Sequence, residues 1–112
     1  MAKKHKALSP QTMQLVAERF KVMSDPMRLQ ILSSLQNGEL NVMEIVEITG
    51  ASQPNVSKHL KILQNAGLLT RRRDGNQVFY QIADASIFVM CELVCESLEQ
   101  RLKTQAEAFL DL

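Results

Sequence analysis

The sequence predicts a mainly α-helical fold with one small β-hairpin. Apolar residues recur at helical spacing in five segments, and each segment follows a residue that caps helices well. Two segments of alternating pattern flank an Asp-Gly turn, which is the usual sequence signal of a hairpin. With 112 residues, the chain has the length of a single domain. We therefore expect four helices, a hairpin and a final long helix, in that order.

The first two helices begin at the same kind of signal. Ser9-Pro10 and Asp25-Pro26 each combine a capping side chain with a proline, which fits the first turn of a helix. Asn37-Gly38 ends the second helix in residues that tolerate left-handed backbone. The apolar positions that follow the two caps are Met13, Val16, Ala17, Phe20 and Met23, and then Leu29, Ile31, Leu32 and Leu35.

The next two helices are short and close together. Asn41 and Glu44 have the spacing of a capping box, which predicts a helix over residues 42–49. Ser52 caps a second helix over residues 53–66, whose apolar positions are Val56, Leu60 and Leu63. Only Gly50-Ala51-Ser52 separates the two helices. This is the helix-turn-helix arrangement, in which the second helix enters the major groove of DNA.

A hairpin and a long helix complete the chain. Residues 69–73 and 77–82 are expected to be its strands, joined by Asp74-Gly75-Asn76. Alternation through residues 77–82 predicts that one face of the hairpin is packed, and we interpret Phe79 and Tyr80 as core residues. Asp84 is the expected cap of the last helix. The apolar stripe of that helix consists of Ile87, Cys91, Val94, Leu98 and Leu102, and Ala106 and Phe109 prolong it.

The charges are distributed unevenly, although the net charge is only +1. Residues 1–28 carry +4 and residues 84–112 carry −4. Residues 53–73 hold five lysines and arginines and no acidic residue. Nucleic-acid binding needs such a local basic block rather than a basic protein. A solvated charged face is the alternative interpretation of this block.

The helix-turn-helix and the basic strand together predict a winged helix-turn-helix that binds double-stranded operator DNA. We expect a homodimer, because a chain this short leaves much of its apolar surface uncovered when it folds alone. Polar residues at the start of the second helix can pair with base edges, and an arginine-rich hairpin can lie along the DNA backbone or in the minor groove. His59 fits phosphate contact or a structural role equally well. The candidate DNA-binding residues are Gln53, Asn55, Ser57, Lys58, His59, Lys61, Arg71, Arg72, Arg73 and Asn76.

The chain resembles the ArsR/SmtB family of repressors over roughly residues 11–100. The resemblance is carried by residues 24–32 (SDPMRLQIL), by residues 52–63 (SQPNVSKHLKIL), and by residues 66–69 (AGLL) followed by residues 72–75 (RRDG). The resemblance implies a homodimer formed by the first and last helices, and repression that an inducer relieves. We expect residues 11–23 and 84–110 to form that interface, since their apolar stripe is longer than one small domain needs.

The chain departs from this family at both familiar metal sites. Asn41 and Met43 stand where many relatives carry two thiols. At the zinc ligands of the last helix, other relatives have aspartate, histidine, histidine and glutamate. The corresponding residues here are Asp84, Ser86, Ser97 and Gln100. We therefore expect no metal site and no cofactor.

Cys91 and Cys95 are the two cysteines, one helical turn apart on the last helix. They are either small buried apolar residues or a thiol sensor for an oxidant, a reactive sulfur species, or a soft metal or metalloid. A disulfide within one helix is geometrically poor, because β-carbons four residues apart lie about 5–6 Å from each other. The inducer stays unknown, and a repressor without a thiol sensor is the alternative.

Other function classes fit the sequence less well. We find no nucleophile triad, phosphate loop or Cys-x-x-Cys pair, so we expect no enzyme. No apolar run approaches the ~20 residues that cross a bilayer, and two cysteines make no secreted disulfide framework, so we expect a cytoplasmic protein without a membrane partner. Residues 1–8 are expected to form a flexible basic tail before a domain over residues 9–112. A winged protein-interaction module without DNA binding remains the competing interpretation.

Overall fold

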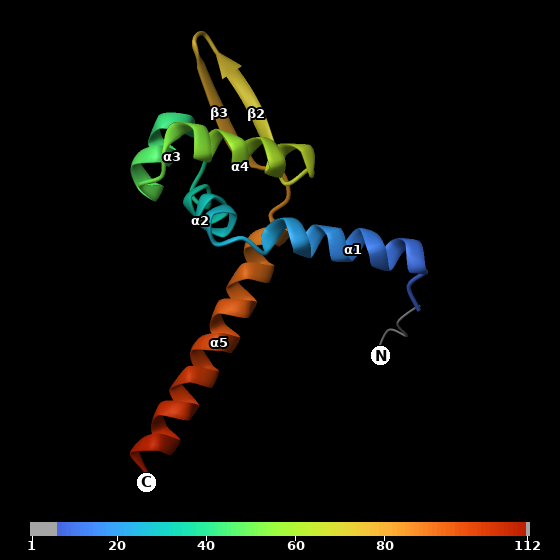
Figure 1. Cartoon of the computed structure of the whole chain (residues 1–112), viewed down its shortest axis with the longest axis vertical. Helices are drawn as coiled ribbons and strands as arrows, with labels where there is room; N and C mark the ends of the chain where they lie inside the picture. The colour runs from blue at the N-terminus through green and yellow to red at the C-terminus, as the bar shows by residue number, and fades with distance from the viewer. Residues whose placement is uncertain (1–6, 112) are drawn as a thin grey trace.

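The computed structural model describes residues 7–111, so that most of the expected basic tail lies outside the described residues. Figure 1 shows α3, α4 and the hairpin gathered at one end, with α1 and α5 extending away from it. The predicted order of four helices, hairpin and long helix is confirmed. The elements are α1 (Pro10–Met23), α2 (Pro26–Ser34), β1 (Leu40–Asn41), α3 (Val42–Thr49), α4 (Gln53–Asn65), β2 (Leu69–Asp74), β3 (Gln77–Ile82) and α5 (Ser86–Leu110).

Side-chain caps start the first four helices where the sequence predicts them. The Ser9 hydroxyl accepts the Thr12 N–H at 3.1 Å, and the Asp25 carboxylate accepts the Arg28 N–H at 3.1 Å. The capping box of α3 is complete: the Asn41 side chain accepts the Glu44 N–H at 2.9 Å, and the Glu44 carboxylate accepts the Asn41 N–H at 3.0 Å. Each cap satisfies a backbone N–H that has no partner inside the helix.

The start of α5 corrects one expectation. Ala85, not Asp84, occupies the cap position, and its side chain makes no capping bond. The Asp84 carboxylate still accepts the N–H of Ser86, the first helical residue, at 2.9 Å. Asp84 therefore acts on the helix start from one position further out.

The sheet has one strand more than the sequence predicts. β1 pairs with β3 antiparallel, so that the strand order is β1-β3-β2. In the hairpin, Arg71 lies opposite Tyr80 and Arg72 lies opposite Phe79. Tyr80 packs partly buried against the core, as the alternation in β3 predicts, because its face of the sheet turns inward. The expectation that Phe79 is also a core residue is wrong, because Phe79 points to the opposite face of the sheet, where its ring lies against Arg72.

The core lies between α2, α3, α4 and the base of the hairpin. Val56, Leu60 and Leu63 contribute one fully buried face of α4, as predicted. On the long helix α5, Ile87 alone among the described residues is buried. The remaining core side chains are Met23, Ile31, Leu32, Leu35, Ile45, Leu68 and Leu69.

The helices α1 and α5 carry most of the exposed large apolar residues. Both project from the rest of the molecule in Figure 1. The exposed side chains are Met13, Leu15, Val16 and Phe20 on α1, and Val89, Leu93, Val94, Leu98, Leu102, Phe109 and Leu110 on α5. Within residues 7–111, no helix combines the length and the apolarity needed to cross a membrane.

Candidate nucleic-acid interface

The helices α3 and α4 meet through a three-residue turn. Gly50 ends α3 with φ at +71°, in the left-handed region that glycine adopts without strain, and its N–H donates to the Val46 carbonyl at 2.8 Å. Ser52 then caps α4 by accepting the Asn55 N–H at 3.3 Å, and Pro54 stands in the first turn. The local sequence therefore sets both the turn and the start of the second helix.

The helix α4 separates its polar side chains from its apolar ones. Gln53, Ser57, Lys58 and Lys61 are exposed on the side away from the core, and Asn55 is partly buried in the first turn. Two lysines stand on this face, and the adjacent helix N-terminus carries the positive end of the helix dipole. The face can therefore bind a polyanion and present amide donors and acceptors to base edges.

The hairpin adds further positive charge beside α4. Figure 1 shows β2 and β3 projecting beyond α4, with the tip at the far end. Gly75 makes this tip with φ at +61°, and Asn76 is exposed next to it. Arg71 and Arg73 are exposed, and neither forms an ion pair among residues 7–111.

Arg72 differs from its two neighbours, because it is held within the sheet. Its guanidinium bonds both oxygens of Glu39, at 2.6 and 3.2 Å, and lies 3.7 Å from Asp74. It also stacks over the Phe79 ring at 4.9 Å. The hydrogen bond from Arg72 lowers the pKa of Glu39, and the same bond raises the pKa of Arg72. This arginine ties the middle of β2 to the residue that precedes β1.

His59 lies apart from the other candidate DNA-binding residues. It is 6% exposed, and its Nδ1 accepts a hydrogen bond from Arg28 Nε at 3.2 Å. Burial lowers the pKa of His59, the charge of Asp25 opposes this, and Lys58 and Arg28 add to the lowering. The structural role is therefore the one that the geometry favours, and we leave His59 out of the contact set.

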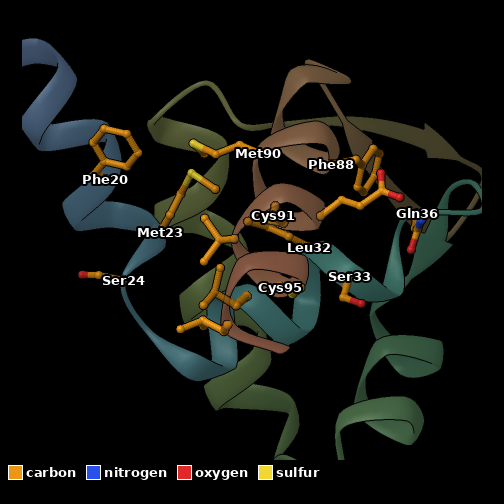
Figure 2. Close-up of a pocket in the computed structure, with 14 residues that line it drawn as sticks. Phe20, Met23, Ser24, Leu32, Ser33, Gln36, Phe88, Met90, Cys91 and Cys95 are labelled. Atoms are coloured by element: carbon orange, nitrogen blue, oxygen red, sulfur yellow. The ribbon is translucent and has the colours of Figure 1, made fainter. Parts of the chain in front are cut away.

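Cys91 and Cys95 both line an apolar cavity of about 650 Å³ between α1, α2 and α5. Figure 2 shows them on α5, with Met23 and Phe20 of α1 on the opposite wall. Cys91 is partly buried and Cys95 is exposed. Burial raises the pKa of the Cys91 thiol, and Cys95 adds to this effect. In the described part of the chain, no group of three or more His, Cys, Asp or Glu side chains could hold a metal ion.

Sequence reasoning missed three features of this region: the strand β1, the bond between Glu39 and Arg72, and the bond between Arg28 and His59. A two-residue strand leaves no periodicity to detect. The two side-chain pairs join residues 33 and 31 positions apart, so no local pattern indicates them.

A helix-turn-helix followed by a basic hairpin defines a winged helix-turn-helix domain. The family model "Bacterial regulatory protein, arsR family" matches residues 25–71. An uncharacterized HTH-type transcriptional regulator of Methanocaldococcus jannaschii is 41% identical over 81 residues, which make up 71% of this chain and 91% of that protein. The chain belongs to the ArsR family of transcription regulators.

The chain is also similar to a second curated relative and to a solved structure. A probable mercury resistance operon repressor of Streptomyces lividans is 39% identical over 71 residues, which make up 63% of this chain. The chain spans little more than half, 57%, of that repressor's length. The homodimeric winged helix-turn-helix DNA-binding domain from Mycobacterium bovis, solved by NMR, superposes with a TM-score of 0.75 at 29% identity, covering 89% of this chain and 95% of that one.

Proposed function

We propose that this chain is a repressor that binds an inverted-repeat operator as a homodimer, through α4 and the β2–β3 hairpin. The observation that carries the proposal is the outer face of α4, which presents Lys58 and Lys61 with Gln53 and Ser57 beside a basic hairpin. The names of the Streptomyces and Mycobacterium bovis relatives support it. The proposed contacts are Gln53, Asn55, Ser57, Lys58, Lys61, Arg71, Arg73 and Asn76, with Arg72 bracing the hairpin.

The test of DNA binding uses the duplex that the wild-type protein selects from a random-sequence library. The variant Lys58→Ala/Lys61→Ala should bind this duplex at least about tenfold more weakly, since each lost base contact costs roughly 1–3 kcal/mol. The affinity of the wild-type protein should also fall steeply with added salt. Lys103→Ala, which removes a lysine from the distant half of α5, is the matched control and should bind like wild type. An unchanged affinity of the double variant would contradict the proposal.

The dimer is proposed because α1 and α5 leave a continuous apolar surface uncovered. α5 has 25 residues, and therefore a length of about 37 Å, yet its stripe residues Leu98 and Leu102 are 54% and 65% exposed. Exposed apolar surface on this scale marks an interaction site. A second copy of the chain is the occupant that we propose, because the cavity between α1, α2 and α5 continues this apolar surface.

Sedimentation of the wild-type protein at micromolar concentration tests the dimer. One chain has a mass of 12.6 kDa, and the expected mass in solution is twice this value. A monomer at that concentration would contradict the proposal. The protein-interaction module without DNA binding would instead give a dimer that selects no duplex.

We further propose that Cys91 and Cys95 are the sensor that releases the operator. Both line the cavity that adjoins the proposed dimer surface, so a modification there adds volume within the seam. Overpacking costs about 1–3 kcal/mol, which shifts a two-state dimer geometry by roughly tenfold. The raised pKa of Cys91 leaves less of this residue as the reactive thiolate, and Cys95 is the more exposed of the two, so Cys95 should react first.

Operator affinity measured with and without peroxide, persulfide, arsenite or zinc tests the sensor. At least one of these should weaken binding by wild type about tenfold, reversibly with reductant or chelator, and should leave Cys91→Ser/Cys95→Ser unaffected. Ser97→Ala, on the same helix, is the matched control that should respond like wild type. A wild-type protein that ignores all four reagents would show that Cys91 and Cys95 are not the sensor.

A further inference from the structure

Arg28 joins three helices through one guanidinium. It belongs to the first turn of α2, where its own N–H donates to the capping carboxylate of Asp25. Its Nη1 donates to the Val22 carbonyl of α1 at 3.0 Å, and its Nε donates to Nδ1 of His59 in α4 at 3.2 Å. A planar guanidinium holds its donors in a rigid fork, so the two acceptors are held at a set separation and angle.

The bond to His59 requires a neutral ring. Nδ1 accepts the hydrogen bond, so the ring proton resides on Nε2. The charged groups around the ring are Arg28 of α2, Lys58 of α4 and Asp25 at the start of α2, and only Asp25 favours the protonated ring. Protonation would remove the acceptor and place a second cation against Arg28.

The two acceptors of Arg28 belong to helices with different proposed roles. α1 contributes to the proposed dimer surface, and α4 carries the proposed DNA contacts. We propose that Arg28 is a positioning residue that holds α4 at a set orientation to α1, so that the two α4 helices of a dimer match the spacing of an inverted repeat. This inference rests on the proposed function, since it needs both the dimer and DNA binding by α4.

This proposal predicts different effects on the affinity for a single half-site and on the affinity for the full inverted repeat. Arg28 is part-buried behind α4, and none of the proposed contact residues bonds to it. Loss of Arg28 should therefore leave the contacts of one α4 helix with one half-site intact. It should weaken binding where two helices must fit two half-sites at once.

The experiment compares two duplexes: the inverted repeat selected by wild type, and the same duplex with one half-site scrambled. Arg28→Ala should bind the inverted repeat about tenfold more weakly and the half-site duplex as wild type does, because a lost bond from a charged donor has about this effect. Gln30→Ala, an exposed change on the same helix, is the control and should match wild type on both duplexes. Arg28→Lys, which keeps the charge but lacks the fork, serves if Arg28→Ala fails to fold, and should show a smaller loss on the inverted repeat alone.

A pH series supplies a readout that a merely structural role would not move. The preference of wild type for the inverted repeat should decline as the pH falls below the ordinary pKa of histidine, about 6.5. His59→Gln, whose amide oxygen can still accept from Arg28, should keep the preference at every pH. Equal losses on both duplexes, or no loss at all, would overturn the positioning role. A wild-type protein that selects no duplex would instead overturn the proposed function.

Discussion

The body of the molecule, formed by α2, α3, α4 and the sheet, differs from its arms, α1 and α5, in how it buries apolar surface. Leu60 in the body is 0% exposed, whereas Leu102 in the arms is 65% exposed. The body closes a core from its own residues, with one side chain from each arm, Met23 and Ile87. The arms present an equally apolar stripe to solvent. The body is therefore built to present α4, and the arms are built to be covered.

The largest effect is expected where the arms meet. Leu98→Asp places a carboxylate in the proposed seam twice, once from each protomer. Each copy should cost about 2–5 kcal/mol in lost leucine contacts, and the unpaired carboxylate adds to this. Sedimentation should show dissociation to monomers. Gln100→Asp, on the opposite face of α5, introduces the same charge and should leave the dimer intact; dissociation by both variants would place the seam elsewhere.

The next effect distinguishes a core leucine from an arm leucine. Leu60→Ala should lower the free energy of unfolding by about 2–5 kcal/mol, because it opens a cavity in a closed core. Leu102→Ala should change it by less than about 0.5 kcal/mol when urea denaturation is measured at concentrations where the protein is monomeric. Similar losses for the two variants would abolish the distinction between body and arms.

A smaller effect is expected at the helix caps. Asn41 completes the capping box of α3, whereas Ala85 at the start of α5 makes no side-chain capping bond. Asn41→Ala should lower the free energy of unfolding by about 1 kcal/mol, as measured by thermal or urea denaturation. Asn37→Ala, an exposed change nearby that removes no capping bond, should be neutral. A neutral Asn41→Ala would mean that packing alone holds α3.

The smallest effect is a pH dependence within the body. Because folding lowers the pKa of His59, the unfolded chain takes up a proton at this residue at a higher pH than the folded chain does. The free energy of unfolding should therefore be greatest above pH ~6.5 and should decline below it. His59→Gln should flatten this part of the curve, whereas Asn65→Ala at the exposed end of α4 should not. Identical slopes for His59→Gln and wild type would show that His59 is not the titrating group.

Local sequence signals were enough to predict the five helices and the hairpin, but not β1, because caps, turns and apolar periodicity act over a few residues and a two-residue strand is too short to show a periodicity. Ser9, Asp25, Asn41 and Ser52 each start a helix where the sequence predicts it. The polar face of α4 follows from the same periodicity. Asp84 shows the limit of such signals, since its carboxylate acts two residues ahead of its own position without being the cap.

Contacts between distant segments could not be predicted in this way. The bonds of Arg72 to Glu39 and of Arg28 to His59 exist only after the sheet and the helices have packed. The sequence alone does not distinguish the three adjacent arginines of β2. In the fold, the pleat of β2 directs Arg72 to the face that holds Phe79 and Glu39. The side chains that remain available to a partner are therefore a property of the fold.

The central claim is that the bodies of two protomers bind DNA, while their arms, α1 and α5, form the dimer interface. A hydroxyl-radical footprint of the wild-type protein on its selected duplex tests this most directly. Two protected segments on the same face of the duplex, about 34 Å or a whole number of helical turns apart, are the predicted result. A single protected segment, or protection that is not repeated in register with the helix, would contradict the account.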